Sequence, residues 1–343
     1  MGNKYKVLVL AGGLSEERQV SLASAKAITE SLIRLEYEVN VIDSATGQSL
    51  LDSGRRYLYE KDSGSDSTMV LKQPAEITLM ESINSKPYKD VDVIFLALHG
   101  GAGENGTIQA LLDLAGKKYT GSSVLASAVA MNKAFAKRLL RNENVPTPNW
   151  LLLKIGNKSE IANYLPVISK KFAPPIIVKP NNSGSTVGLT LVKGFSDLAP
   201  AVEKAFEAAN EVLIEEYIKG REITAAIFNG KALPLVEIIP SHELYDYQCK
   251  YTKGKSQYIC PAEIPEMAAK EIRELAMKAY EIIGCSGLVR ADFILDSNSH
   301  PYFLEINTLP GMTELSLAPL AAKQAGISFD QLIEKICESA LDK

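Results

Sequence analysis

The amino-acid sequence predicts an α/β protein that opens with a parallel sheet and continues as α+β in its middle and C-terminal parts. Two strands of the buried type, at residues 6–10 and 91–98, each lead into a glycine-rich loop and then a helix, as βαβ units do. Residues 288–295 and 302–307 are short apolar runs on either side of a polar turn, which is the pattern of a β-hairpin. A chain of 343 residues is too long for one core, so we expect two or three domains.

Composition excludes several classes of protein. Hydrophobic residues make up 46% of the chain and charged residues 23%, as in soluble globular proteins. A net charge of −4 gives no reason to expect nucleic acid or an anionic membrane as partner, and no apolar run approaches the ~20 residues of a membrane span. The cysteines form no close pair and no metal-binding spacing, so we expect reduced thiols and a cytoplasmic protein; they are Cys249, Cys260, Cys285 and Cys337.

The first strand leads into a glycine-rich turn and a helix that begins near Ser21. The turn is not the dinucleotide-binding fingerprint, which needs a third glycine. Glu17, at its end, has two readings: a solvated carboxylate favoured by the helix dipole, or a ligand-binding acid at the carboxyl end of a strand. Residues 38–42 predict the second strand, and residues 44–86 predict a surface excursion with one or two short strands.

The strand at residues 91–98 ends in a second polar, glycine-rich loop, which begins with His99. A lone histidine in such a place is more often a hydrogen-bonded structural residue than a catalyst. After a short helix, a longer helix is predicted at about 127–141 and carries Lys133. The prolines within residues 145–148 break this helix and predict a domain boundary.

The middle region contains a strand at residues 176–180 that ends in a basic, rigid pair with Lys179. The loop 181–188 follows; it is rich in small and hydroxyl residues and can fold over phosphates with its N–H groups. A merely flexible turn is the alternative, and Lys179 favours phosphate. The strand at residues 212–218 carries two acids, which either bind adenine or ribose groups or form a solvated strand end.

The remaining elements surround the hairpin. Loops as long as residues 241–261 are usually functional inside a compact domain. The other expected elements are a hairpin at 221–228 and 233–239, an amphipathic helix at 266–283, and closing helices at 315–324 and 329–341.

The hairpin carries the strongest chemical signal. Side chains alternate along a strand, so Arg290 and Asp292 share one face of its first strand, and Glu305 and Asn307 share one face of its second. If these faces coincide, three oxygen ligands converge beside an arginine. Buried carboxylates are costly unless they are paired or bind metal, and oxygen-only ligands suit Mg²⁺, which leaves positions for water and nucleotide phosphates. The alternative is one arginine–carboxylate ion pair and a hydrogen-bonded asparagine in an ordinary hairpin.

Five blocks of sequence, in this order, resemble those of the D-alanine–D-alanine ligase family of the ATP-grasp superfamily. They are GGLSEERQVSLASA, LALHGGAGENGTIQALL with YTGSS, VKPNNSGSTVG, DYQCKY, and GLVRADF with EINTLPGMTELSL. The resemblance spans nearly the whole chain and implies a three-domain ATP-grasp architecture. Its N-terminal substrate domain would occupy residues 1–125, its central domain 126–218, and its C-terminal domain, with the metal and substrate site, 219–343.

The resemblance implies ATP and two D-alanine molecules as substrates, Mg²⁺ (Mn²⁺ as an alternative; two ions) as cofactor, and a homodimer. By position, the phosphate-binding lysines would be Lys133, Lys179 and Lys250. The acids for adenine and ribose would be Glu215 and Glu222, with the backbone of Glu216 and Ile218 at the adenine edge. The magnesium ligands would be Asp292, Glu305 and Asn307.

On the substrate side, Glu17 resembles the acid that holds the ammonium group of the first D-alanine, with Ser185 and Tyr251 as hydrogen-bonding partners. Arg290 and the amide of Gly311 resemble the groups that stabilise the oxyanion. The residues that would line the substrate pockets are His99, Ser316 and Leu317. The loops 183–188 and 241–261 would act as lids that exclude water from the acyl phosphate.

Three positions depart from the common pattern of the family: Thr186, Asn105 and the pair Glu314-Leu315. The last adjoins the pocket for the second substrate, so a sister ligase that takes another second substrate, such as D-lactate or D-serine, stays an alternative. A nucleotide-binding protein without turnover is a third reading. The complete set of magnesium ligands and Arg290 argue against it.

Overall fold

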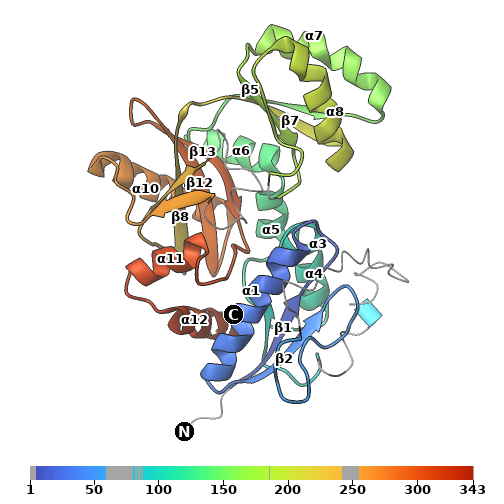
Figure 1. Ribbon diagram of the computed structural model, residues 1–343, viewed down its shortest axis with the longest axis vertical. Coiled ribbons are helices and arrows are strands. Elements are labelled where there is room, and N and C mark those ends of the chain that lie inside the picture. The colour runs from blue at the N-terminus through green and yellow to red at the C-terminus, as the bar shows by residue number, and fades with distance from the viewer. Residues whose placement is uncertain are drawn as a thin grey trace.

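Three β-sheets follow one another along the long axis of the computed structural model, which describes residues 5–58, 80–81, 83, 86, 88–184, 186–241 and 255–342. A three-stranded sheet with α1 lies at one end, a six-stranded sheet in the middle, and a four-stranded sheet with α7 and α8 at the other end (Figure 1). The predicted α/β class, with a parallel sheet first and antiparallel sheets after it, is confirmed.

The N-terminal sheet is parallel, with β1 between β2 and β3. Its core residues are apolar and β-branched, and α1 covers one face with Leu22 and Ile28. The predicted strand at 91–98 is shorter than expected, because only residues 93–96 pair with β1. The elements are β1 (Lys6–Ala11), α1 (Arg18–Arg34), β2 (Glu38–Asp43), β3 (Val93–Leu96), α3 (Gly101–Glu104) and α4 (Thr107–Leu114).

The helix predicted at about 127–141 is in fact two helices, α5 (Val124–Met131) and α6 (Lys133–Asn142). Asn132 separates them in an extended conformation, and its side-chain oxygen accepts a hydrogen bond from the backbone of Phe135 at 3.0 Å. Asparagine competes for backbone groups in this way and favours helix caps over helix interiors. The prediction of one helix was therefore wrong, and Lys133 begins the second helix instead of lying inside one.

The four-stranded sheet is antiparallel, in the order β4-β7-β5-β6. α7 and α8 cover one face with an apolar core. The other face turns toward the six-stranded sheet. The elements are β4 (Trp150–Lys154), the 3₁₀ turn Lys158–Glu160, α7 (Ile161–Lys171), β5 (Ile176–Pro180), β6 (Thr190–Val192), the 3₁₀ turn Phe195–Asp197, α8 (Leu198–Ala208) and β7 (Glu211–Glu216).

The six-stranded sheet has the order β11-β10-β8-β12-β13, with β9 paired to β8, and α10 packs on one face. The predicted hairpin at 288–307 is confirmed as β12 and β13. The predicted loop at 241–261 contains a strand at its end, β11, because this segment pairs with the edge strand β10. The elements are β8 (Gly220–Phe228), β9 (Lys231–Ala232), β10 (Val236–Pro240), β11 (Ser256–Ile259), α10 (Glu266–Ile283), β12 (Leu288–Asp296) and β13 (Pro301–Asn307).

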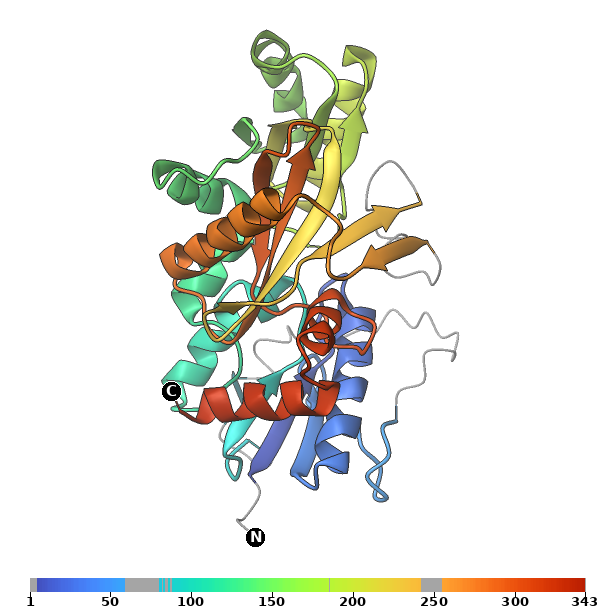
Figure 2. The ribbon, with the colours of Figure 1, turned by 90° about the vertical axis from the view of Figure 1, so that its left-hand side faces the viewer.

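The last two helices, α11 (Leu317–Gln324) and α12 (Phe329–Leu341), return to the N-terminal sheet. α12 lies beside α1 (Figure 2), and Leu332 and Ile336 share one apolar core with Val7 of β1 and Val236 of β10. α5 and α6 pack in the core of the six-stranded sheet. Helices thus pack on sheets that are distant from them in the sequence. The domain boundaries at residues 125 and 218 stay a prediction.

Candidate active site

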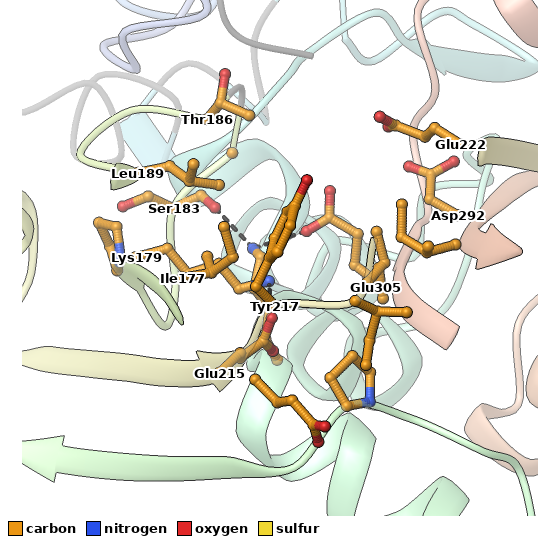
Figure 3. A pocket seen from close by; sticks show the side chains of 18 of the residues that line it. Ile177, Lys179, Ser183, Thr186, Leu189, Glu215, Tyr217, Glu222, Asp292 and Glu305 are labelled. Atoms are coloured by element: carbon orange, nitrogen blue, oxygen red, sulfur yellow. Dashed lines mark hydrogen bonds and ion pairs between the residues drawn. The ribbon is translucent and has the colours of Figure 1, made fainter. Parts of the chain in front are cut away.

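A cavity of about 140 Å³ lies between the four-stranded and six-stranded sheets, and its wall combines apolar and charged side chains (Figure 3). Apolar residues such as Ile177 and Leu304 could hold a planar base, while charged groups could hold phosphates. Eight of the residues implied by the resemblance line it: Lys133, Lys179, Glu215, Glu216, Ile218, Glu222, Asp292 and Glu305.

Strand alternation explains the wall contributed by the four-stranded sheet. Val178 and Ile214 point into the core beneath α8, so their neighbours Lys179 and Glu215 point the opposite way, into the cavity. Because β5 and β7 are adjacent antiparallel strands, the two side chains meet, with Nζ of Lys179 2.8 Å from Oε2 of Glu215. Glu215 is only 2% exposed, so its reading as a solvated strand end was wrong.

The register of β12 and β13 settles which faces coincide. Asp292 lies directly opposite Glu305, and Arg290 lies opposite Asn307, so all four belong to one face of the sheet. A β-bulge between Asp292 and Phe293 breaks the alternation on β13, and Leu304 and Glu305 both line the cavity as a result.

Asp292 is held in place by two neighbours. It accepts hydrogen bonds from Nε of Arg290 at 2.9 Å and from Oγ1 of Thr224 at 2.6 Å, while a second guanidinium nitrogen lies 2.8 Å from its other oxygen. Asn307 accepts a hydrogen bond from the amide of Leu309 at 3.0 Å. The ion pair and the hydrogen-bonded asparagine of the alternative reading are therefore present, but Asp292 still lines the cavity together with Glu305.

The donor set on this face suits Mg²⁺. It offers two carboxylates and one amide, all oxygen ligands, and Mg²⁺ commonly takes one or two carboxylates and completes its coordination with water and phosphates. Within the described residues, no group of three or more His, Cys, Asp and Glu side chains forms a metal site by itself.

Lys133 connects this face to the loop after β5. Its ammonium lies 3.2 Å from Glu305 and donates to the carbonyl oxygen of Ser183 at 2.7 Å. The same loop lies against Glu17: a Cβ atom added to Gly184 would lie 2.3 Å from a carboxylate oxygen of Glu17, and one added to Gly100 would lie 2.5 Å from it. The predicted acid for the first substrate thus lies beside the predicted phosphate loop.

His99 lines a second cavity, of about 200 Å³, between the loops that follow β1 and β3. Burial lowers the pKa of His99, which favours the neutral ring. Nδ1 is 2.9 Å from the carbonyl oxygen of Leu309 and must donate to it, so Nε2 accepts from the hydroxyl of Ser24 at 3.0 Å. Ser24 in turn accepts from the amide of Met312 at 3.2 Å. Both ring nitrogens therefore hold protein groups in position.

Glu104, which sequence reasoning missed, completes this polar cluster. Its carboxyl group accepts hydrogen bonds from the amides of Gly100 at 2.6 Å and Leu309 at 3.3 Å. Burial, and next the charge of Glu17, raise its pKa to about 8. The segment 309–312, which contains Gly311, is thus fixed by buried polar residues of the N-terminal part of the chain.

Ser316 and Leu317 begin α11. Ser316 is the residue before its first turn, and its hydroxyl accepts from the amide of Thr313 at 3.1 Å. A Cβ atom on Gly311 would lie 3.1 Å from this hydroxyl, so the two predicted substrate-side positions are neighbours. The positive end of an eight-residue helix suits a carboxylate. The side chain of Leu317 is buried in the core, which leaves its backbone for a ligand.

Some predicted residues lie outside the described part of the chain: Ser185, Lys250, Tyr251, and most of the predicted lid at 241–261. Sequence reasoning also missed several residues of the site. The places of Thr224 and Leu304 in the site depend on the strand register and on the β-bulge, which the sequence pattern does not show. Lys137 had a signal in the sequence, because it follows Lys133 by four positions and so lies on the same face of α6.

Comparisons with known families cover both halves of the chain. The description "D-ala D-ala ligase N-terminus" matches residues 6–122, and "D-ala D-ala ligase C-terminus" matches residues 139–338. The chain is 39% identical over 335 residues to a D-alanine–D-alanine ligase of Syntrophotalea carbinolica, covering 98% of this chain and 96% of that protein. It is 41% identical over 336 residues to one of Magnetococcus marinus, with 98% and 97% coverage.

Similar solved structures belong to the same family. A D-alanine–D-alanine ligase of Bacillus anthracis in complex with ATP matches with a TM-score of 0.75 and 31% identity, covering 98% of both chains. A ligase of the same name from Coxiella burnetii matches with a TM-score of 0.80 and 27% identity, covering 99% of this chain and 95% of that one. Within the described residues, no helix combines the length and apolarity that a membrane span requires.

Proposed function

The chain belongs to the D-alanine–D-alanine ligase family, and from this we propose that it joins two D-alanines into D-alanyl-D-alanine for peptidoglycan synthesis, at the expense of ATP. One observation supports this more than any other. The cavity between two sheets collects lysines and acids from five strands and α6 at the positions that the family resemblance implies. ATP is the nucleotide, as in the ATP complex of the relative from Bacillus anthracis.

In this proposal, the first D-alanine is activated by phosphoryl transfer. A carboxylate is a poor electrophile until one of its oxygens becomes part of a good leaving group, so its oxygen attacks the γ-phosphorus of ATP and releases ADP. Lys133 and Lys179 line the cavity and would neutralise the phosphates, with Lys250 as the third lysine. Glu215 and Glu222 would bind adenine and ribose, with the backbone of Glu216 and Ile218 at the adenine edge.

Mg²⁺, with Mn²⁺ as an alternative, would be held by Asp292, Glu305 and Asn307, and we expect two ions. When bound, it would neutralise charge on the transferred phosphoryl group. The chain's own residues prepare this site, because Arg290 and Thr224 orient Asp292, and Lys133 balances the charge of Glu305.

The second D-alanine then attacks the D-alanyl phosphate with its amine, and inorganic phosphate leaves. Glu17, with Ser185 and Tyr251, would hold the ammonium group of the first D-alanine. Arg290 and the amide of Gly311 would stabilise the tetrahedral oxyanion, an effect worth about 10²–10³-fold in rate for one such donor. The substrate side is completed by the start of α11 and the polar cluster, through Ser316, Leu317 and His99.

Four further expectations belong to this proposal. The loops 183–188 and 241–261 would exclude water, because water would hydrolyse the acyl phosphate. The cysteines within the described residues are free thiols, Cys260, Cys285 and Cys337, which supports a reducing cytoplasm. A homodimer and the three domains at 1–125, 126–218 and 219–343 are expected from the family resemblance.

A product assay tests the function. Purified protein with ATP, Mg²⁺ and D-alanine should release phosphate and form the dipeptide, detected by mass spectrometry, whereas L-alanine should give neither. D-serine and D-lactate compete in parallel reactions; preferential incorporation of either would make the chain a sister ligase. Tight ATP binding without dipeptide under these conditions would instead establish a nucleotide-binding protein without turnover.

A further inference from the structure

Lys137 has the least exposed charged group near the nucleotide cavity, with a relative exposure of 0%. Its ammonium lies 2.9 Å from Oε1 of Glu215 and donates to the hydroxyl of Thr147 at 2.7 Å; the carbonyl oxygen of Phe303 lies 3.4 Å away. Removing a charge from water is costly unless it is paired and hydrogen-bonded. A lysine with three such partners is therefore part of a built site.

The partners of Lys137 come from different parts of the fold. Glu215 is on β7 of the four-stranded sheet, and Phe303 is on β13 of the six-stranded sheet, two residues before Glu305. Thr147, which precedes β4, accepts from Lys137 and donates to the carbonyl oxygen of Phe303 at 2.9 Å. Lys137 thus joins the two sheets on the side of Glu215 that faces away from the cavity.

Glu215 divides its two oxygens between two lysines. Oε1 pairs with Lys137 at 2.9 Å, and Oε2 pairs with Lys179 at 2.8 Å. Lys179 lines the cavity, whereas Lys137 lies behind the wall. With the rear cation present, one carboxylate oxygen is held back, and the carboxylate cannot turn entirely toward Lys179.

α6 presents both of its buried lysines to acids of the cavity wall. Lys133 pairs with Glu305 at 3.2 Å, and Lys137, one helical turn later, pairs with Glu215 at 2.9 Å. One turn of helix rises about 5.4 Å, so a rigid element sets the spacing of the two acids. In the proposed function, these acids serve opposite ends of the nucleotide, adenine and the metal-bound phosphates.

We propose that Lys137 is a positioning residue for ATP: it fixes the carboxylate of Glu215, and through it Lys179, at the distance from Glu305 that the nucleotide requires. The proposal rests on the function proposed above and extends it to a residue that does not touch the substrate. Burial lowers the pKa of Lys137 to about 8, against the opposing effect of Glu215, as expected for an ammonium enclosed in this way.

The test compares Lys137→Met with Arg138→Met in the full chain. Methionine keeps the length of the side chain and removes the charge; Arg138 is the next residue of α6, is exposed, and serves as the matched control. We expect Lys137→Met to raise the KM for ATP, and the Kd for ATP measured by calorimetry, by about ten- to a hundredfold. The KM for D-alanine should stay within about twofold of wild type, and Arg138→Met should change neither constant.

Two further variants separate positioning from a general loss of folding. Thr147→Val keeps the shape of the side chain and removes the hydroxyl, so it should raise the KM for ATP in the same direction by about three- to tenfold. In a Glu215→Gln background, Lys137→Met should add little to the KM for ATP, because the carboxylate that it positions is gone.

The proposal fails if Lys137→Met lowers the melting temperature but leaves the Kd for ATP of the folded protein unchanged, or if the KM values for ATP and D-alanine rise together. If Lys137→Met does not fold, Thr147→Val decides, and an unchanged KM for ATP overturns the proposal. If wild-type protein makes no dipeptide, the proposed function fails, while the Kd for ATP still tests Lys137.

Discussion

Glu215 and Glu104 are equally hidden from solvent, with relative exposures of 2% and 6%, yet their charges are controlled in opposite ways. Burial alone would raise the pKa of Glu215, but Lys137 and Lys179 outweigh it and hold that pKa below its ordinary value. Glu104 accepts its hydrogen bonds from backbone amides, and burial with the nearby charge of Glu17 raises its pKa to about 8. At similar depths of burial, paired cations therefore decide whether the pKa of a buried acid falls or rises.

The same contrast, between acids paired with cations and acids held by neutral hydrogen bonds, separates the nucleotide cavity from the junction between the N-terminal loops and the segment 309–312. Three acids of the nucleotide cavity are paired with cations: Glu215 with two lysines, Asp292 with Arg290, and Glu305 with Lys133. These pairs could exchange partners when phosphates and metal enter, because each lysine or arginine is a phosphate ligand in its own right. The junction between the N-terminal loops and the segment 309–312 instead uses neutral hydrogen bonds, which hold a fixed position.

The largest expected effect comes from removing a carboxylate of the cavity. Asp292→Asn and Glu305→Gln should each lower kcat by about 10³-fold, because a metal ligand supplies several kcal/mol to the transition state. Dipeptide formation measures this, and circular dichroism should show an unchanged fold. Asp296→Asn, at the far end of β12, is the control and should keep normal rates. Near-normal turnover in both cavity variants would remove the metal assignment.

Breaking the lysine-paired carboxylate should be the next largest effect, this time on stability. Glu215→Gln leaves the fully buried ammonium of Lys137 without its anion, which should cost about 3–5 kcal/mol of unfolding free energy in urea titrations. Lys137→Met added to Glu215→Gln should recover part of that loss, since it removes the unpaired charge. Glu216→Gln, at the exposed neighbouring position, should change stability by less than about 0.5 kcal/mol. A Glu215→Gln protein as stable as wild type would contradict the charge pairing.

The raised pKa of Glu104 predicts a pH dependence of opposite sign to that of an ordinary paired acid. Between pH 4.5 and about pH 8, the carboxyl group of Glu104 has lost its proton in the unfolded chain but keeps it in the folded protein. The folded state then binds more protons, so the contribution of Glu104 to the unfolding free energy is full below pH 4.5 and is lost as pH rises toward 8. Glu104→Gln removes this dependence.

Urea unfolding of wild type and Glu104→Gln at pH 5, 6.5 and 8 measures the effect. The unfolding free energy of wild type minus that of the variant should decrease steadily from pH 5 to pH 8. A difference that is constant, or that grows with pH, would show that Glu104 is an ordinary ionised carboxylate and would remove the contrast with Glu215.

The smallest expected effect lies in the hydrogen bonds of the junction. Ser24→Ala removes the hydroxyl that contacts His99 and Met312 and should lower the unfolding free energy by about 1–2 kcal/mol. Thr29→Val on the same helix is the matched control: its buried hydroxyl has no hydrogen-bond partner among the described residues, so the change should be neutral or stabilising. Equal losses in both variants would mean that the junction bonds add nothing specific.

Local patterns in the sequence predicted much of the fold and part of the site. Alternation along two apolar runs predicted that Arg290 and Asp292 share one face and that Glu305 and Asn307 share another, and the strand register shows that the two faces coincide. Other features depend on contacts between distant segments. The alternation of side chains along a strand gives no sign of the β-bulge beside Leu304. The break between α5 and α6 depends on the side chain of Asn132, which also accepts a hydrogen bond from Asn181, 49 positions away.

The buried partners were the hardest to predict. Lys137 lay in a predicted helix and Glu104 in a predicted polar loop, and charged side chains in either place normally face solvent. Only the approach of β13 to α6, and of the segment 309–312 to α3, encloses them. The chemistry of the site was therefore predictable from its motifs, whereas the burial of the residues that support those motifs becomes apparent only in the folded chain.

The return of α12 to the N-terminal sheet has a consequence for biosynthesis. Ser31 on α1 donates to Asp330, which is 299 positions further along the chain. A ribosome adds roughly 5–20 residues per second, so the first sheet waits at least about 15 seconds for the helix that covers it. During that interval the apolar surface around Val7 and Leu22 is incomplete, and a nascent chain stalled before residue 329 would present it to chaperones and proteases.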